Sequence, residues 1–462
     1  MIEKIKKNSI YVFSLVLLVW GIIFSQLLIP WQTPDERNHL WFIGEGVGNM
    51  KVYDLLIEDM PMDFERIMFK YDEKISDKQM TEAKHKAPSY SVADVAPHTF
   101  KPALIKHLPA AIGLYLGILL RLPTYWALAL GELFSLLLYV VICTCIVKMV
   151  PKNKALFAAF LMIPMNIQQC TSISYDAVLL PLCYLYIAWL YKIRCERRNL
   201  TNKEIIGLIL IWALITYVKV PYGALGLLFF IIPINRYVVT IKDREFKFKN
   251  NIQTYSIIIA VILIVALLGA YVLRKDVNVA VLIACARNMK QAIKLFVVSM
   301  KTWWKYLLVS MIGQFGYLDA PIRAWMMVVS VLGLLVIGAI GKNKNPNANH
   351  LNTIGWQERL LFLATSVILL VILTLALIRH TYMIMYYGSE SMQVAVDYNQ
   401  MLYQIPYIGG EQGRYYLPGF LTFLLVFVDL IKTNERIEKA LSVLLIVFFI
   451  VISYITLKAR YF

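Results

Sequence analysis

PWQTPDERNH, residues Pro30–His39, directly follows the first long apolar run of the chain. The stretch contains two prolines, two adjacent carboxylates, an arginine and a histidine. Ionisable groups are costly at the edge of a hydrophobic segment, so those that occur there are candidates for function. The functional interpretation therefore depends on which other polar residues lie on the same side of the membrane.

The composition is that of a membrane protein. The chain has 462 residues, of which 59% are hydrophobic, and its mean hydropathy is +0.63. Several apolar runs reach the length of about 20 residues that a helix needs to cross a bilayer. A β-barrel would instead show short segments of alternating hydrophobicity, which the sequence lacks. We therefore expect an all-α polytopic protein, with residues 1–462 forming a single integral membrane domain in contact with the lipid bilayer.

The net charge of +17 does not indicate a nucleic-acid partner. The lysines and arginines lie in short loops between apolar runs, where they set the orientation of the spans. Lys4, Lys6 and Lys7 precede the first run, which places the N-terminus in the cytoplasm. That run is too long for the apolar part of a signal peptide and lacks a cleavage site of small residues, so we expect a retained span. The six cysteines form no CxxC pair and mark no metal site.

The apolar runs and the basic loops together predict about eleven transmembrane helices with the C-terminus outside. The basic loops Lys148–Lys154, Lys192–Lys203, Arg236–Lys249, Lys342–Arg359 and Lys432–Lys439 then all face the cytoplasm. The predicted spans are residues 9–29, 124–149, 154–168, 174–192, 204–219, 221–235, 253–273, 322–340, 358–378, 415–431 and 439–457.

Three external segments connect these spans. Residues 31–122 form a first external loop with juxtamembrane helices, and Lys101–Leu122 is read as a helix that lies on the outer surface or dips back into it. If that helix crossed the membrane, every later basic loop would face outward. Residues 274–320 form an external amphipathic segment, with a basic stripe of Arg287, Lys290, Lys294, Lys301 and Lys305 opposite Met289, Ile293, Phe296, Met300 and Trp304. Such a helix lies in the membrane interface.

The third external segment, residues 379–414, is rich in tyrosine. Tyrosine rings pack on the C–H faces of sugars while their hydroxyls form hydrogen bonds. An interfacial aromatic belt is the alternative, and it accounts for most of these tyrosines.

With this topology, polar residues from five separate parts of the chain lie on the outer side. Two of the connections are too short to hold their charged residues in bulk water, so these residues need partners, a cavity or a substrate. The candidates are Asp35, Glu36 and His39 after the first span, Asp176 in SYD, Lys219 and Tyr222 in KVPY, Asp319 in GQFGYLDAP, and Arg414 and Tyr415 in EQGRYYLP.

Each candidate also has a structural alternative. The acidic pair of PWQTPDERNH would cap the helix that follows, and His39 would serve as a structural hydrogen-bonding residue. Asp176 would cap the next span or pair with Lys219. Arg414 would be an arginine whose guanidinium reaches the interface.

The five motifs PDERNH, SYD, KVPY, GQFGYLDAP and QGRYYLP, in this order, resemble a domain-of-unknown-function family of bacterial multi-spanning membrane proteins. Its members often accompany genes for cell-surface polysaccharides. This family in turn distantly resembles the GT-C glycosyltransferases, which transfer sugar from a polyprenyl phosphate. One departure is Glu132, which stands where the related pattern has an arginine, so the resemblance implies no phosphate contact from the second span.

The resemblance implies a GT-C-like fold and a membrane glycosyltransferase of the bacterial cytoplasmic membrane with its active face outside. A polyprenyl-phosphate-linked sugar would be the donor, and a cell-surface glycan or a lipid-linked molecule the acceptor. Asp35 or Glu36 would be the catalytic acid or base, and Arg414 and Lys219 would lie near the lipid phosphate. No cofactor is implied with certainty; several carboxylates would suit a divalent metal, although no fixed ligand spacing marks one.

Two other classes of function remain open. A flippase or transporter for lipid-linked glycans would need polar residues that run through the membrane, whereas here they gather on one face. A non-catalytic scaffold of a polysaccharide assembly machine would keep the same fold.

Overall fold

The computed structural model describes residues 2–28, 30–60, 74–241, 244–254, 277–342, 354–388, 396–433 and 435–462, with scattered positions between 256 and 274. The predicted span 253–273 therefore lies mostly outside the described residues. The chain divides into two compact units, and each is described by itself. Unit 1 comprises Met1–Trp189, Val309–Ala348 and Phe427–Phe462, and unit 2 comprises Leu190–Leu308 and Asn349–Val426.

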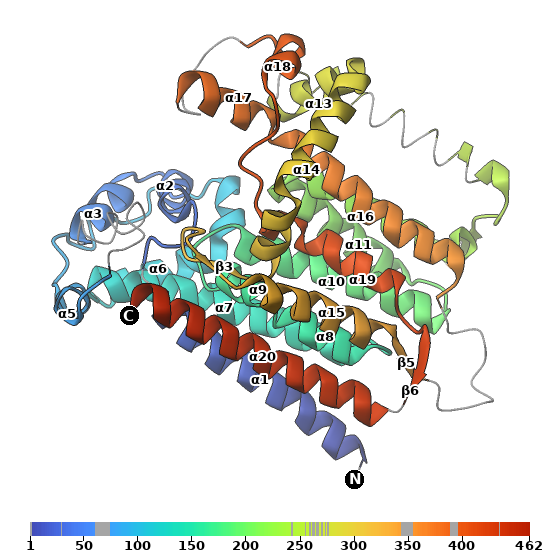
Figure 1. Ribbon diagram of the computed structural model, residues 1–462, viewed down its shortest axis with the longest axis horizontal. Coiled ribbons are helices and arrows are strands. Elements are labelled where there is room, and N and C mark those ends of the chain that lie inside the picture. Colours follow the sequence, from blue (N-terminus) through green and yellow to red (C-terminus); the bar gives the residue numbers. More distant parts are fainter. Residues whose placement is uncertain are drawn as a thin grey trace. The chain divides into compact units, whose positions relative to one another are not determined.

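Three long helices organise unit 1: α1 (Ile2–Leu27), α7 (Thr124–Met149) and α20 (Glu435–Tyr461). Helix α1 packs against both α7 and α20, and Figure 1 shows α1 and α20 side by side with the N- and C-termini at opposite ends of the pair. The shorter elements of this unit are α2 (Glu36–Gly46), α3 (Lys51–Asp59), α5 (Asp77–His85), η1 (Pro102–His107), α6 (Leu108–Leu119), α8 (Lys154–Leu161), α9 (Pro164–Cys170) and α15 (Ala324–Ala339).

Helices α6 and α7 form a closely packed hairpin. A Cβ atom added to Gly113 would lie 2.2 Å from the carbonyl oxygen of Leu130, and one added to Gly117 would lie 2.5 Å from the Cα of Ala127. Glycines four residues apart let two backbones approach in this way. The sequence of Lys101–Leu122 thus folds as a 3-10 turn followed by a helix of 12 residues that is held along the start of α7.

Helix α10 (Asp176–Glu196) begins in unit 1 and ends in unit 2, and α14 (Met289–Gly313) runs from unit 2 into unit 1. The remaining helices of unit 2 are α11 (Asn202–Val218), η2 (Val220–Ile231), η3 (Ile234–Arg236), α13 (Val277–Arg287), α16 (Trp356–Ala376), α17 (Ile378–Tyr387), α18 (Tyr398–Gln404), η5 (Gly413–Tyr416) and α19 (Leu417–Val426).

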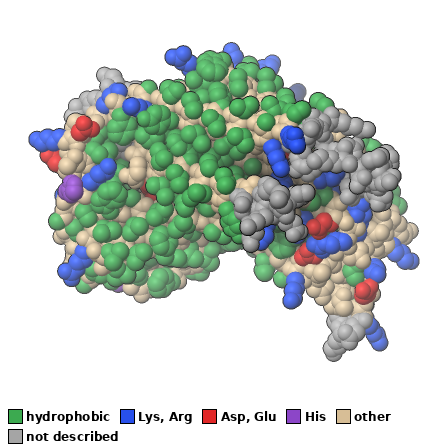
Figure 2. Space-filling view, turned by 90° about the horizontal axis from the view of Figure 1, so that it is seen from below, with side chains coloured by type: hydrophobic (Ala, Val, Ile, Leu, Met, Phe, Trp, Pro, Cys, Tyr) green, Lys and Arg blue, Asp and Glu red, His purple; other side chains and the backbone are tan. Residues whose placement is uncertain are grey.

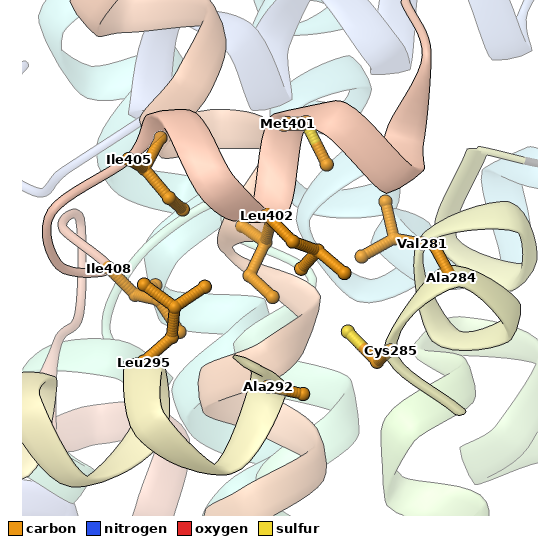
Figure 3. Packing of buried hydrophobic residues seen from close by; sticks show 10 residues of the cluster. Val281, Ala284, Cys285, Ala292, Leu295, Met401, Leu402, Ile405 and Ile408 are labelled. Atoms are coloured by element: carbon orange, nitrogen blue, oxygen red, sulfur yellow. The ribbon is translucent and has the colours of Figure 1, made fainter. Parts of the chain in front are cut away.

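Helices α13 and α14 bury small and aliphatic side chains against α18 and the segment after it. Figure 3 shows Ala292 and Leu295 of α14 with Leu402 and Ile408 in this cluster. The predicted basic stripe of α14 is exposed. The opposite stripe predicted from the sequence is not the buried one, since Met289 and Trp304 are 62% and 50% exposed. The α14 residues in the buried cluster are instead Ala292 and Leu295.

Strands are short and occur as three pairs in the described part of the chain. β1 (Val238–Ile241) and β2 (Arg244–Lys247) are antiparallel, with Val238 opposite Lys247. β3 (Gln314–Phe315) and β4 (Ala320–Pro321) are also antiparallel. β5 (Ile340–Lys342) and β6 (Ile431–Thr433) are parallel, with Ile340 opposite Ile431. The prediction of a helical protein is thus confirmed.

Seven described helices are long and apolar enough, by length and composition, to cross a bilayer. Two of the seven, Pro102–Leu119 and Met289–Gly313, lie in segments that the sequence predicted to be external. Two predicted spans are shorter in the structure: residues 154–168 are divided into α8 and α9 before Pro164, and residues 221–235 fold mainly as the 3-10 helix η2. The count of eleven therefore stays a prediction. Figure 2 shows hydrophobic side chains over most of the face in view; side chains such as Leu15 and Leu444, 60% and 65% exposed, suit contact with lipid. The seven spans are Ser9–Leu27, Pro102–Leu119, Thr124–Met149, Asp176–Glu196, Met289–Gly313, Trp356–Tyr387 and Arg436–Tyr461.

Candidate functional site

The turn that connects α1 to α2 is strained. Trp31 and Asp35 have φ values of 73° and 65°, a left-handed conformation that costs non-glycine residues free energy and often occurs at functional sites. Asp35 occupies the N-cap position of α2, but its side chain forms no capping hydrogen bond. The structural alternative in which Asp35 caps the helix is therefore not what the structure shows.

Glu36 lies in the first turn of α2 and is only 4% exposed. Its Oε2 accepts a hydrogen bond from the backbone N–H of Trp31 at 3.0 Å, and the N–H groups of Ile173 and Thr33 also donate to the carboxylate. Burial raises the pKa of Glu36 to about 7 although these three donors act to lower it. A carboxyl group with this pKa can accept or release a proton near neutral pH.

A second acid faces Glu36 from the neighbouring long helix. Glu132 of α7 lies close enough for an electrostatic interaction with Glu36. Two nearby carboxylates repel each other, so both are not ionised at the same time without cost. Glu132 was the residue that departs from the related sequence pattern, and the structure brings it to the acidic motif.

His39 is one helical turn after Glu36 and is 4% exposed. Its Nε2 lies 3.0 Å from the Oγ of Ser174, and its Nδ1 lies 3.0 Å from Nε2 of His107 in η1. The ring also contacts that of Tyr175 edge-on, with 4.9 Å between the ring centroids. Ser174, His39 and His107 thus form a chain, which we call the serine–histidine relay.

Hydrogen-bond accounting favours one direction for this relay. The Oγ of Ser174 accepts from the backbone N–H of Asp176 at 3.2 Å and has one proton to donate. If it donates to Nε2 of His39, then Nδ1–H of His39 donates to Nε2 of His107. The Ser174 hydroxyl and both ring nitrogens of His39 then each take part in a hydrogen bond. The opposite direction leaves the Ser174 proton without an acceptor among the described residues. In this direction Nε2 of His39 is the acceptor and Nδ1–H the donor of the relay.

Two predicted site residues of unit 1 have structural partners. Asp176, 3% exposed, begins α10, and its backbone N–H holds Ser174 as described. Asp319 accepts from Nε of Arg460 at 2.5 Å and from the hydroxyl of Tyr461 at 3.2 Å. This buried ion pair attaches the β3–β4 turn to the end of α20. The geometry of Asp319 is that of a structural ion pair, while its predicted role with substrate stays a prediction.

The four predicted residues of unit 2 lie together. The Nζ of Lys219 is 3.8 Å from the ring centroid of Tyr415 and 5.8 Å from that of Tyr222. The guanidinium carbon of Arg414 lies 5.2 Å from the Tyr415 ring, and the hydroxyl of Tyr222 donates to the carbonyl of Tyr415 at 2.6 Å. Arg414 is 3% exposed, so it does not extend to the interface as a surface arginine would. Two cations on aromatic rings form a site suited to an anion.

One further acid stands out in unit 2. Glu411, three residues before Arg414, is 3% exposed, and within the described residues neither of its carboxylate oxygens accepts a hydrogen bond. Burial raises its pKa to about 7. The sequence placed Glu411 in a motif but assigned it no role; an acid in a short loop beside Arg414 was the signal that could have identified it.

A metal centre has no ligand set in the described ranges, where no group of three or more His, Cys, Asp or Glu side chains is close enough to hold an ion. Unit 1 thus groups acidic and histidine side chains, and unit 2 groups basic and aromatic ones.

Comparisons with known proteins identify a family. No curated protein and no solved structure matches the chain. The family described as "Predicted membrane protein (DUF2142)" matches residues 70–424. This match contains Asp176, Lys219, Tyr222, Asp319 and Arg414 with Tyr415, but the Pro30–His39 stretch precedes it. Because the match covers well over half of the 462 residues, the chain belongs to the DUF2142 family of predicted membrane proteins.

Proposed function

We propose that this protein is a membrane glycosyltransferase of GT-C type. It takes a sugar from a polyprenyl phosphate and transfers it to a cell-surface glycan or a lipid-linked acceptor at the outer face of the bacterial cytoplasmic membrane. The observation that carries the proposal is Glu36, a buried carboxyl group with a pKa of about 7 at the end of a membrane span. A general base works best when its pKa is near the working pH.

In this proposal an acceptor hydroxyl attacks the anomeric carbon of the donor sugar. The new bond forms from the acceptor oxygen to that carbon, and the bond from the carbon to the phosphate oxygen breaks. Glu36 takes the hydroxyl proton, and the electron pair leaves with the polyprenyl phosphate. Glu36 is favoured over Asp35 because Glu36 is the buried acid with the raised pKa.

The serine–histidine relay supports the base. His39 lies one turn from Glu36 on α2, and its hydrogen bonds to Ser174 and His107 fix the orientation of the ring. We assign His39 a positioning role, exerted through these two hydrogen bonds. Glu132 interacts electrostatically with Glu36, so the two carboxyl groups are not ionised together without cost.

Within unit 2, the cluster of Lys219, Tyr222, Arg414 and Tyr415 is suited to an anion such as a lipid phosphate. Arginine binds phosphate with a bidentate fork, and lysine acts as a point charge. Stabilising an anionic leaving group is a form of electrostatic catalysis. The aromatic rings hold the two cations in place before the anion arrives.

A comparison of Glu36→Gln with Glu45→Gln tests the proposal. Glu45 lies on the same helix, is exposed, and pairs with Lys101 at 3.9 Å, so it is a matched control. In cells that express each variant at the same level, we expect Glu36→Gln to lose the surface glycan and to accumulate the polyprenyl-linked sugar. Glu45→Gln should behave as wild type. Normal surface glycan in Glu36→Gln cells would exclude the proposed base and would favour a scaffold.

A further inference from the structure

Three arginines in unit 2 converge on one carboxylate, away from the residues discussed so far. Arg194, in the last turn of α10, donates to Oε1 of Glu358 from Nη2 at 2.5 Å and from Nε at 2.8 Å. Glu358 lies in the first turn of α16. Arg197 follows the end of α10, with a left-handed φ of 52°, and Arg236 ends η3.

The charges of these residues act on one another. Burial and then the charge of Arg194 lower the pKa of Arg197. Burial and then the charges of Arg194 and Arg197 lower the pKa of Arg236. Glu358 opposes both effects. With three positive charges and one negative charge, this triple-arginine cluster carries a net charge of +2.

The acids nearest in sequence are already engaged. Arg198 binds Glu196 at 2.8 Å and Glu204 at 2.5 Å, and Lys192 lies 3.8 Å from Glu196. These contacts leave Glu358 as the carboxylate that interacts with the cluster. The N-terminus of α16 adds partial positive charge to the same place.

Two donors of the cluster are buried without an acceptor. In the part of the chain that the structure describes, Nε of Arg197 and Nη1 of Arg236 form no hydrogen bond. A buried donor of a charged group costs free energy unless it is satisfied. An anion with several acceptor oxygens would satisfy both the excess positive charge and these guanidinium donors.

We propose that Arg194, Arg197 and Arg236 form a binding site for a phosphate group. Guanidinium groups match the oxygens of phosphate geometrically, and three of them can share one phosphate. Arg194 lies in the last turn of a candidate span, and Trp356 at the start of α16 is 72% exposed, as tryptophans at the membrane interface often are. This position suits the headgroup of an anionic lipid; a free phosphate would use the same chemistry. On the predicted topology the site faces the cytoplasm, so it is separate from the proposed transferase site.

Thermal unfolding of the purified, delipidated full-length protein tests the site. One arm adds inorganic phosphate at constant ionic strength, balanced with sodium chloride. The other compares nanodiscs of phosphatidylcholine with nanodiscs that also contain phosphatidylglycerol. We expect the Tm of wild type to rise by several degrees, and Arg197→Gln and Arg236→Gln to lose most of that rise. Arg244→Gln, an exposed change on β2 of the same unit, should keep it.

The two arms identify the source of the phosphate. A rise with phosphatidylglycerol alone supports a lipid site, and a rise with inorganic phosphate alone supports a soluble ligand. No rise in either arm, or the same rise in all variants, would overturn the proposal.

A second readout separates binding from a purely structural role. Without added anion, Arg197→Gln and Arg236→Gln should melt no lower than wild type, because each removes repulsion within the cluster. Arg236→Lys, which keeps the charge but loses the fork, should retain only part of the anion response. Variants that melt well below wild type without anion, and still respond to it fully, would contradict the site.

Discussion

At the scale of the residue, Glu36 shows how two opposing effects set the chemistry of a carboxyl group. Three backbone N–H groups favour its ionised form, while nearly complete burial disfavours it and raises the pKa to about 7. The sequence predicted that Glu36 and His39 belong to one site, since residues three apart share a helix face. It did not predict His107 or Ser174 as partners of His39, because these contacts join positions 68 and 135 residues apart.

The buried carboxyl group of Glu411 should make the stability of the protein depend on pH. Its pKa rises from an ordinary value of 4.5 to about 7 on folding, so the folded state holds this proton more tightly than the unfolded state. Below about pH 4.5 the carboxyl group is protonated in both states, and the wild type keeps its full stability. As the pH rises to about 7, the unfolded state releases the proton while the folded state holds it, so the free energy of unfolding falls. Above about pH 7 the buried charge leaves the wild type destabilised by about 3 kcal/mol. Glu411→Gln should therefore melt higher than wild type at pH 8.5 and equally at pH 4.5, as measured by thermal unfolding in detergent. A constant difference at every pH would contradict the buried charge.

We expect the serine–histidine relay to affect the rate of sugar transfer. His39→Gln should lower sugar transfer by about 100-fold, because the misplacement of a reacting group can cost that much. His107→Gln should lower it less and change the pH profile, because the ring of His39 would lose its orienting partner. His98→Gln, an exposed histidine of the same loop region, is the control. If His107→Gln and His98→Gln had the same pH profile as wild type, His107 would have no positioning role.

At the scale of the element, the sequence identified most long helices but not how they pack. The predicted span 174–192 corresponds to α10, and the predicted span 124–149 coincides with α7. Residues 221–235 were predicted as a span from their hydropathy, but they fold mainly as the 3-10 helix η2, a difference that hydropathy does not report. Similarly, a helical stripe predicted which side chains of α14 share a face, but the buried face is the one that carries Ala292 and Leu295.

We expect the close packing of α6 against α7 to contribute to stability. In Gly117→Ala the new methyl would lie 2.5 Å from the Cα of Ala127, so the helices must separate, at a cost of about 1–3 kcal/mol. Thermal unfolding should show a lower Tm for this variant. Gly409→Ala, whose nearest contacts are 3.9 Å and beyond, should leave the Tm unchanged. Equal melting of both variants would show that the close approach of α6 and α7 contributes nothing to stability.

At the scale of the whole molecule, composition predicts the class of protein. The high hydropathy led to a helical membrane protein, and the family match agrees with it. The exact number of spans depends on helices of 10 to 17 residues, which are too short for a clear decision by length. Of the residues in the five motifs, the structure brings His39 and Ser174 together in unit 1 and Lys219, Tyr222, Arg414 and Tyr415 together in unit 2.

Topology can be tested by labelling single cysteines in a cysteine-free background. The first external loop and the basic inner loops predict opposite accessibility. Lys84→Cys should react with a membrane-impermeant maleimide in intact cells, and Lys203→Cys only after the membrane is opened. Reaction of Lys203→Cys in intact cells would invert the predicted orientation.

The most direct test of the central claim is the pH dependence of sugar transfer in proteoliposomes, measured with a panel of polyprenyl-phosphate hexoses as donors. If Glu36 is the general base, kcat/KM of the wild type should rise with pH through about 7, because the base must be ionised. Glu36→Gln should lose about 100-fold or more and lose this pH step, while Glu45→Gln keeps both. A Glu36→Gln protein that transfers sugar at the wild-type rate with the same pH profile would contradict the account.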